Sequence, residues 1–242
     1  MIKVVVSDPM AKDGLDILRA SGLFDVTTVD GGDAAALKSA LSDAAALLVR
    51  SGTKVTADVM AAAPALKLVG RAGTGVDNVD VEAATRRGIV VMNTPDANSI
   101  AAAELTWTLL LALVRNVVPA ATSMAAGKWE RSALMGTELA GKTLGVVGFG
   151  RIGREVAARA RAFDMTVLVS DPFVTDEIAR AAGARLVALD GLLAASDVVT
   201  LHLPLTKGTR HLVGASQLAS MKPGARLVNC ARGGLVDEAA LK

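Results

Sequence analysis

The sequence predicts an α/β protein built from two open, parallel β-sheets. Short apolar runs alternate with alanine-rich stretches of helical periodicity, which is the pattern of repeated strand–helix units. Hydrophobic residues make up 52% of the chain but aromatic residues only 2%, so valine, leucine, isoleucine and alanine must fill the core. Such a core is typical of buried parallel strands covered by helices. A length of 242 residues leaves room for two domains.

Residues 1–94 are predicted to form the first domain. Asp8 followed by Pro9 is a typical helix start, with a capping side chain and then a proline at the first helical position. Asp80 is the expected cap of a helix that begins at Val81. Five strands are expected around these helices: Ile2–Val6, Phe24–Val29, Ala46–Val49, Lys67–Gly70 and Ile89–Asn93.

Residues 100–127 form a long helical stretch that is apolar on nearly all sides at first and is interrupted by Pro119. We expect this helix to join the two domains and to pack against a second subunit, giving a homodimer or a higher homo-oligomer. A helix buried within one domain is the alternative. Its most apolar part, Leu105–Val114, is about half as long as a membrane span and is flanked by Glu104 and Arg115, so no membrane partner is expected.

Residues 95–242 are predicted to form the second domain. Asp237 is the expected cap of a helix within which the sequence ends. A dinucleotide-binding fold made of two mononucleotide halves has about one strand more than this segment contains. We therefore expect the domain to be incomplete at its carboxyl end and the natural chain to continue. The expected strands are Thr143–Val147, Met165–Val169, Arg185–Val187, Val198–His202 and Arg226–Cys230.

The charge distribution and the cysteine content indicate which binding partners and which cellular compartment to expect. The net charge is +2, and the lysines and arginines are scattered rather than gathered in a stripe, so no nucleic-acid partner is expected. The apolar run at the start of the chain is too short for a signal peptide. A single cysteine, Cys230, excludes an internal disulfide and suits a reducing, cytoplasmic setting.

The motif with the most specific chemistry is a G-x-G-x-x-G turn that follows a buried strand. Its glycines, Gly148, Gly150 and Gly153, precede a predicted helix at Arg154–Phe163. Such glycines allow a tight turn, close approach of a diphosphate, and close packing of helix on strand. Asp171 follows the next strand, 171 − 153 = 18 residues after the last glycine, where a carboxylate binds the ribose hydroxyls and repels a 2′-phosphate. The domain is therefore predicted to be Rossmann-type and to bind NAD; a plain glycine turn with a helix-capping aspartate is the alternative.

Arginines and glycines at three other strand ends are suited to an anionic ligand. Arg232 follows the last predicted strand, where open α/β sheets bind ligands, and its guanidinium could hold a carboxylate. The loop Gly70–Asp77 offers exposed backbone N–H groups, and Arg50 ends a third strand. Together these groups could converge on a doubly charged small acid. Taken singly, each arginine fits a solvated surface residue equally well.

Six segments together resemble the D-isomer-specific 2-hydroxyacid dehydrogenases along essentially the whole chain. The resemblance implies a flavodoxin-like substrate domain at residues 1–94 and an NAD-binding domain at residues 95–242. It is greatest to the members that oxidise 3-phospho-D-glycerate to 3-phosphohydroxypyruvate, the first step of phosphorylated L-serine biosynthesis. The segments are Gly70–Asp80, Met92–Leu105, Lys128–Leu139, Gly148–Glu155, His202–Leu205 and Asn229–Glu238.

The resemblance also implies roles for individual residues. Arg232 would be the catalytic arginine that orients the substrate, Asn98 would be a hinge between the domains, and no metal is expected. The substrate would be bound by Arg50, Ser51, Arg71, Gly73, Thr74, Gly75 and Asn98, with Arg131 reaching in from a neighbouring subunit. The cofactor would be bound by Thr74, Gly148, Gly150, Arg151, Ile152, Gly153, Asp171, Pro172, His202, Leu203, Pro204, Cys230, Ala231 and Arg232.

Two departures from the family pattern affect the expected activity. Ser170 stands before Asp171, where such enzymes usually have an aromatic residue. The family's glutamate–histidine pair, which takes the hydroxyl proton, belongs beyond Lys242, and neither His202 nor His211 is expected to replace it. We therefore expect the 242-residue chain to turn over very little. The alternatives are a reductase of glyoxylate, hydroxypyruvate or another 2-hydroxyacid, and a non-catalytic NAD-sensing protein such as a transcriptional corepressor.

Overall fold

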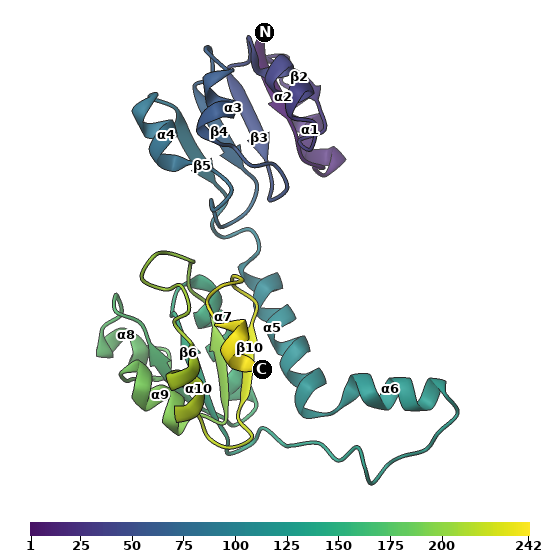
Figure 1. Ribbon diagram of the computed structural model, residues 1–242, viewed down its shortest axis with the longest axis vertical. Coiled ribbons are helices and arrows are strands. Elements are labelled where there is room, and N and C mark those ends of the chain that lie inside the picture. Colours follow the sequence, from purple (N-terminus) through teal and green to yellow (C-terminus); the bar gives the residue numbers. More distant parts are fainter. The chain divides into compact units, whose positions relative to one another are not determined.

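The computed structural model describes all 242 residues. The chain divides into two compact units, Met1–Asn98 and Ser99–Lys242. Each unit contains one five-stranded sheet, drawn in Figure 1, and every strand pair in both sheets is parallel. The predicted α/β class with two open, parallel sheets is confirmed.

The first unit has the strand order β2-β1-β3-β4-β5. The order reverses between β1 and β3, which is the arrangement of flavodoxin-like folds, and ligands bind at the carboxyl ends of the strands near such a reversal. Val5, Leu41, Leu47, Met60 and Val69 are fully buried at its centre. The elements are β1 (Ile2–Val6), α1 (Lys12–Ala20), β2 (Phe24–Thr28), α2 (Ala34–Leu41), β3 (Ala46–Val49), α3 (Ala57–Ala61), β4 (Leu68–Arg71), α4 (Val81–Arg86) and β5 (Val90–Asn93).

The second unit has the strand order β10-β9-β6-β7-β8. Its chain runs outward from the central β6 first on one side and then on the other, which corresponds to five strands of a Rossmann-type sheet. The elements are α5 (Ser99–Val114), α6 (Val117–Ala125), β6 (Thr143–Val147), α7 (Arg151–Ala162), β7 (Thr166–Ser170), α8 (Asp176–Ala181), β8 (Arg185–Leu186), α9 (Leu189–Ala195), β9 (Val198–Leu201), α10 (Ala215–Ser220), β10 (Arg226–Asn229) and α11 (Glu238–Leu241).

The predicted strands are all present, each within one residue of its expected ends. Two of the predicted helix caps are also confirmed: the Asp80 carboxylate accepts a hydrogen bond from the amide of Ala83, and the Asp237 carboxylate accepts one from Ala239. The predicted helix start at Asp8 and Pro9 is wrong, since α1 begins at Lys12. The Asp8 carboxylate instead accepts hydrogen bonds from the loop that follows β3.

The long helix predicted at residues 100–127 is broken, but not by Pro119. The break lies at Asn116, whose φ is 52°, and α5 and α6 meet there at an angle of 64°. Pro119 lies in the first turn of α6, where a backbone N–H has no helical acceptor to lose. No single helix is long and apolar enough to cross a membrane, and α5 and α6 meet that criterion only as a bent pair.

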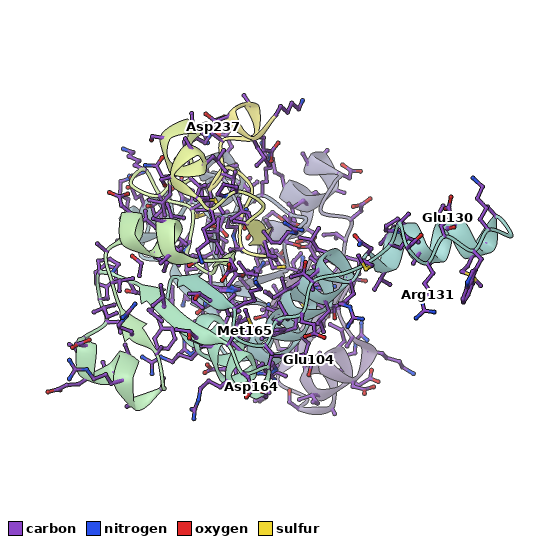
Figure 2. All side chains as sticks on the ribbon, turned by 90° about the horizontal axis from the view of Figure 1, so that it is seen from below. Glu104, Glu130, Arg131, Asp164, Met165 and Asp237 are labelled. Carbon is purple, nitrogen blue, oxygen red and sulfur yellow. The ribbon has the colours of Figure 1, made fainter.

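One face of α5 is buried and another is exposed. On the buried face, Trp107 stacks on Phe163 with ring centroids 4.7 Å apart, and its indole N–H donates to the carbonyl of Val156. On the exposed face, Leu105 and Leu109 are 53% and 47% accessible. Figures 1 and 2 show that α6 and the segment after it project away from the sheet of the second unit. Helix α6 contributes no residue to the core of the second unit, whereas Leu139, where the chain returns toward β6, is buried in it.

Candidate functional site

The turn after β6 has glycines where side chains would not fit. Gly148 has a φ of 90°, and a Cβ there would lie 2.5 Å from the carbonyl oxygen of His202. A Cβ on Gly153 would lie 2.2 Å from the carbonyl oxygen of Gly148. Helix α7 can therefore pack closely against β6 only because both positions lack side chains.

Helix α7 begins at Arg151, three residues earlier than predicted, so its amino end lies directly at the glycine turn. The first N–H groups of a helix have no acceptor within it, and together with the helix dipole they favour an anion. A Cβ built on Gly150 meets no atom within 4 Å. No protein atom thus excludes a side chain at position 150, and the free space over its backbone fits a diphosphate.

The Asp171 carboxylate faces this turn. One of its oxygens accepts a hydrogen bond of 2.7 Å from the amide of Phe149, and the other accepts one of 2.8 Å from the amide of Phe173. A carboxylate has about four lone-pair positions, so it can accept further hydrogen bonds from two hydroxyl groups. Asp171 is thus hydrogen-bonded to Phe149, the residue before Gly150 in the turn. A ribose-binding acid requires this placement beside the glycine turn.

His202 and Leu203, which directly follow the neighbouring strand β9, support the turn. The Nε2 atom of His202 lies 2.9 Å from the hydroxyl of Thr200, and burial lowers the pKa of the imidazole to about 4. The ring is therefore neutral near pH 7 and makes a poor proton acceptor. The Cβ of Leu203 lies 3.2 Å from the place of a Cβ on Gly148, so this side chain packs beneath the turn. Pro204 continues the loop, and its carbonyl accepts a hydrogen bond from the Thr209 hydroxyl.

The buried His202 makes stability depend on pH. A free histidine titrates near pH 6.5, so between pH 6.5 and pH 4 the unfolded chain binds a proton at this ring that the folded chain does not. Stability is therefore complete above pH 6.5 and falls as the pH drops. We expect the free energy of unfolding of the second unit to fall by about 2 kcal/mol between pH 7 and pH 5 because of this histidine. Urea unfolding of wild type and His202→Gln at both pH values measures this, and equal losses in the two proteins would contradict it.

The segment after β10 is a turn held by Asn229. Its side-chain amide donates to the carbonyl of Arg232 at 2.8 Å, and its side-chain oxygen accepts from the amide of Ala231 at 3.0 Å. These bonds place Cys230, Ala231 and Arg232 at the carboxyl end of β10, on the same edge of the sheet as the glycine turn. Arg232 also donates to the carbonyl of Ala231 at 2.8 Å. The role of Asn229 could not be predicted, because a single asparagine at the end of a strand carries no signal of its own.

In the first unit, the loop after β4 is tied to the segment after β5. The Thr74 hydroxyl donates to the side-chain oxygen of Asn98 and, at 3.3 Å, to the carbonyl of Pro95. The side chain of Asn93, which sequence analysis missed, donates to the carbonyl of Thr74 at 2.6 Å. The loop Gly73–Gly75 is thus fixed to the end of the unit that contains Asn98.

Two of the arginines predicted to bind the substrate lie at neighbouring strand ends of this unit. Arg71 ends β4, and its Nη1 atom would be 1.8 Å from a Cβ on Gly73, so the guanidinium lies directly over that glycine. Arg50 follows β3, which pairs with β4, and its Nη1 atom donates to the carbonyl of Pro9 at 3.2 Å. A pocket of about 380 Å³ adjoins Ser51 on this edge.

Arg131 lies elsewhere in the second unit, on the segment that follows α6. Figure 2 shows Glu130 and Arg131 on this projecting part, away from Met165 at the sheet. The Ser123 hydroxyl donates to Glu130 at 2.7 Å and ties the segment to α6. Arg131 therefore does not join the other predicted residues of the second unit within one subunit.

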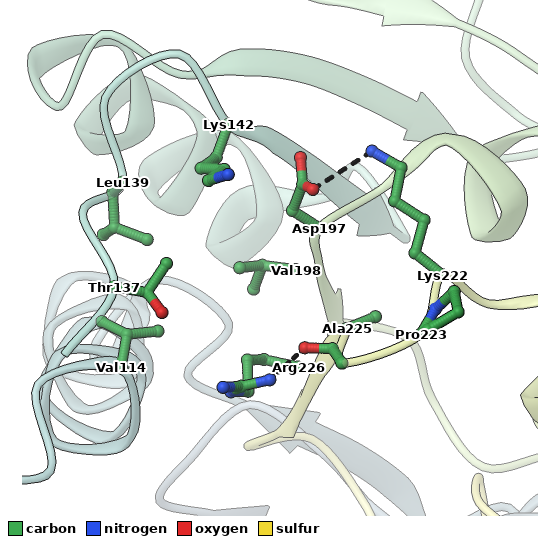
Figure 3. Close-up of a pocket in the computed structure, with 11 residues that line it drawn as sticks. Val114, Thr137, Leu139, Lys142, Asp197, Val198, Lys222, Pro223, Ala225 and Arg226 are labelled. Carbon is green, nitrogen blue, oxygen red and sulfur yellow. Dashed lines mark hydrogen bonds and ion pairs between the residues drawn. The ribbon is translucent and has the colours of Figure 1, made fainter. Parts of the chain in front are cut away.

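The second unit also has a small cavity at the opposite end of its sheet. It has a volume of about 170 Å³ and lies where β6, β9 and β10 begin, as Figure 3 shows. Asp197 accepts a hydrogen bond from the amide of Thr143 and one from Lys222 at 3.2 Å. Burial by itself would raise the pKa of Asp197, but these bonds and nearby lysines outweigh it and lower the pKa. Asp197 is thus paired with Lys222, and the cavity contains none of the predicted site residues.

Comparison with known proteins identifies the family. Residues 107–242 match the D-isomer specific 2-hydroxyacid dehydrogenase, NAD binding domain, which is more than half of the chain. The chain belongs to the D-isomer-specific 2-hydroxyacid dehydrogenase family. The second unit is accordingly an NAD-binding domain of this family, in agreement with the open glycine turn and the carboxylate that faces it.

Relatives of this dehydrogenase family match the chain along its whole length. The D-3-phosphoglycerate dehydrogenase of Methanocaldococcus jannaschii is 50% identical over 242 residues, and that of Homo sapiens is 49% identical over 239 residues. The chain covers 46% and 45% of these two proteins, so it spans less than half of their length. The predicted resemblance to the phosphoglycerate-oxidising members is confirmed.

Solved structures share the fold of this chain. The TT0316 protein of Thermus thermophilus is 39% identical, has a TM-score of 0.91, and aligns over 99% of this chain and 77% of its own. A D-lactate dehydrogenase of Aquifex aeolicus, solved with NAD and lactic acid, is 30% identical with a TM-score of 0.86 and aligns over 99% of this chain and 72% of its own.

Proposed function

We propose that this chain is part of an enzyme that oxidises 3-phospho-D-glycerate to 3-phosphohydroxypyruvate with NAD, the first step of phosphorylated L-serine biosynthesis. The observation that carries the proposal is the glycine turn with Asp171 bonded to Phe149, which forms the cofactor side of the site. The phosphoglycerate dehydrogenases that match at about half identity support the choice of substrate.

Each residue of the proposed site has a separate role. The guanidinium of Arg232 pairs with the substrate carboxylate and polarises the carbonyl that forms, because a planar fork of N–H donors matches a carboxylate. Arg50 and Arg71 bind the phosphate, and the backbone of Gly73–Gly75 helps to hold the carboxylate. NAD, when bound against Gly150 and Asp171, supplies the nicotinamide that accepts hydride.

The choice of substrate is tested by binding with and without the phosphate. Isothermal titration of the 242-residue chain should give a dissociation constant at least about tenfold lower for 3-phospho-D-glycerate than for D-glycerate, since an arginine–phosphate contact contributes about 1.4 kcal/mol or more. Arg50→Ala and Arg71→Ala should each remove most of this preference. Arg86→Ala, on the exposed side of α4, is the control and should keep it. Equal affinities in the wild type would instead favour a reductase of an unphosphorylated 2-hydroxyacid.

We further propose that the 242-residue chain turns over poorly. A proton acceptor has to lie within hydrogen-bond reach of the substrate hydroxyl and titrate near the working pH. The ring of His202 has a pKa of about 4 and is bonded to Thr200, and His211 lies 3.9 Å from Asp237 beside α11. The turnover number of the purified chain is measured in steady-state assays. A value equal to that of a complete family member would contradict this proposal.

We also propose that the exposed faces of α5 and α6 pack against a second copy of the chain. Leu105, Leu109 and Leu113 lie on one exposed stripe, each at least 45% accessible, and Val118 of α6 is 67% accessible. A contiguous exposed apolar surface of this kind marks an interaction site. Trp129 is 78% accessible in the projecting segment and would contribute to the same interface, next to Arg131.

A further inference from the structure

The loop after β3, residues 50–53, is held in place by a buried carboxylate. Asp8 is only 9% exposed, and it accepts hydrogen bonds from the amide of Arg50 at 2.6 Å, the amide of Thr53 at 3.0 Å and the hydroxyl of Thr53 at 2.9 Å. A Cβ on Gly52 would lie 2.7 Å from the same carboxylate. The loop therefore wraps around Asp8 at a distance that only glycine at position 52 permits.

The same loop is held from its other side by Asn78. The side-chain N–H groups of Asn78 donate to the carbonyl of Arg50 at 2.8 Å and to the carbonyl of Thr53 at 2.7 Å. Asp8 thus binds the N–H groups of residues 50 and 53, while Asn78 binds the C=O groups of the same two residues. The loop has no regular secondary structure, so these side-chain bonds determine its conformation.

The bonds also fix the direction of the Arg50 side chain. Its guanidinium donates to the carbonyl of Pro9, the residue next to Asp8, so Asp8 and its neighbour hold both the backbone and the side chain of Arg50. Burial alone would raise the pKa of Asp8, but the hydrogen bonds from Arg50, Thr53 and Gly52 lower it. Asp8 is therefore ionised at neutral pH, and charge-assisted hydrogen bonds are stronger than neutral ones.

We propose that Asp8 and Asn78 are positioning residues that set the selectivity of the substrate site for phosphate by fixing the loop that carries Arg50. The inference rests on the proposed function, in which Arg50 binds the substrate phosphate. Neither residue touches the substrate. A guanidinium that is displaced by about 1 Å loses much of its contact with a phosphate, so the position of the loop matters as much as the presence of the arginine.

The test uses Asp8→Asn and Asn78→Ala in the 242-residue chain, with 3-phospho-D-glycerate and D-glycerate as probes in isothermal titration. An asparagine at position 8 has only one acceptor oxygen, so it can accept fewer of the three hydrogen bonds. Its side-chain NH2 group would also face the backbone N–H groups of the loop. Each variant should lower the preference for the phosphorylated acid by about tenfold while the affinity for D-glycerate stays within about twofold. Asp33→Asn is the matched control, because Asp33 also accepts two backbone N–H bonds in this unit, at the start of α2, and should keep the preference.

A double-mutant cycle separates positioning from a general loss of structure. Asp8→Asn should have no further effect on the preference in an Arg50→Ala background, since the two changes act through one guanidinium. If the wild type prefers 3-phospho-D-glycerate and Asp8→Asn keeps that preference, the inference is overturned and the proposed function stands. If the wild type has no preference, the proposed substrate fails and the inference fails with it. Should Asp8→Asn not fold, Asn78→Ala decides by the same criteria.

Discussion

Gly150→Ala is expected to abolish most NAD binding while leaving the free energy of unfolding nearly unchanged. The backbone at Gly150 has a φ of −72° and a ψ of −157°, which alanine can adopt, and an added Cβ meets no protein atom within 4 Å. The unfolding free energy should therefore change by less than about 1 kcal/mol. The same Cβ would stand where the diphosphate approaches the amino end of α7, so the dissociation constant for NAD should rise at least about 100-fold, which corresponds to about 3 kcal/mol.

Two alanine substitutions serve as controls for Gly150→Ala. Gly191 also has free space around it but lies in α9, so Gly191→Ala should leave NAD binding unchanged and stabilise the helix by up to about 1 kcal/mol. Gly153→Ala places a Cβ 2.2 Å from the carbonyl of Gly148 and should destabilise the fold. Urea unfolding and NAD titration are measured on each protein. Unchanged NAD affinity in Gly150→Ala would show that no diphosphate lies against this turn.

Asp171→Asn is expected to weaken NAD binding and to remove the discrimination against NADP. The carboxylate accepts hydrogen bonds from Phe149 and Phe173, and its free lone pairs are placed to accept two ribose hydroxyls. An amide has only one acceptor oxygen and no charge, so the dissociation constant for NAD should rise about tenfold or more. The loss of repulsion toward a 2′-phosphate should bring the NADP and NAD constants within about threefold of each other. Fluorescence titration with both cofactors measures the two constants.

Asp176→Asn is the matched control for this substitution. Asp176 is an exposed aspartate five residues further along, in the first turn of α8, and pairs with Arg180. Its replacement should change neither constant by more than about twofold. A wild-type chain that binds NADP as well as NAD would contradict the assignment of Asp171 before any variant is made.

The strands and the glycine turn could be predicted because their signals are local. Most strands are short apolar runs bounded by turn residues, and the turn at Gly148–Gly153 is defined by spacing alone. The start of α7 was predicted three residues late, because the glycine-rich stretch around Arg151 has no helical signal of its own. The break at Asn116 was missed because Pro119 is the stronger helix breaker in isolation, yet the first turn of α6 accommodates it.

The residues that position the site could not be predicted from local pattern. Asp8 has the sequence of a helix cap, but its carboxylate binds a loop more than 40 residues away in the chain. Asn78, Asn93 and Asn229 each hold a loop through backbone groups that only the fold brings near them. A wrongly predicted cap is therefore informative here: a capping residue without its helix has another partner, and at Asp8 that partner is the Arg50 loop.

The most direct measurement is an NAD titration of the 15N-labelled chain followed by the amide signals of both ends of the second sheet. We expect saturable shifts to concentrate at residues 148–153 and at Asp171, where the diphosphate and the ribose are expected to bind. Signals from Lys142, Asp197 and Arg226, around the cavity at the other end of the sheet, should stay in place. Shifts around that cavity with none at the glycine turn would show that NAD does not bind against Gly150 and Asp171.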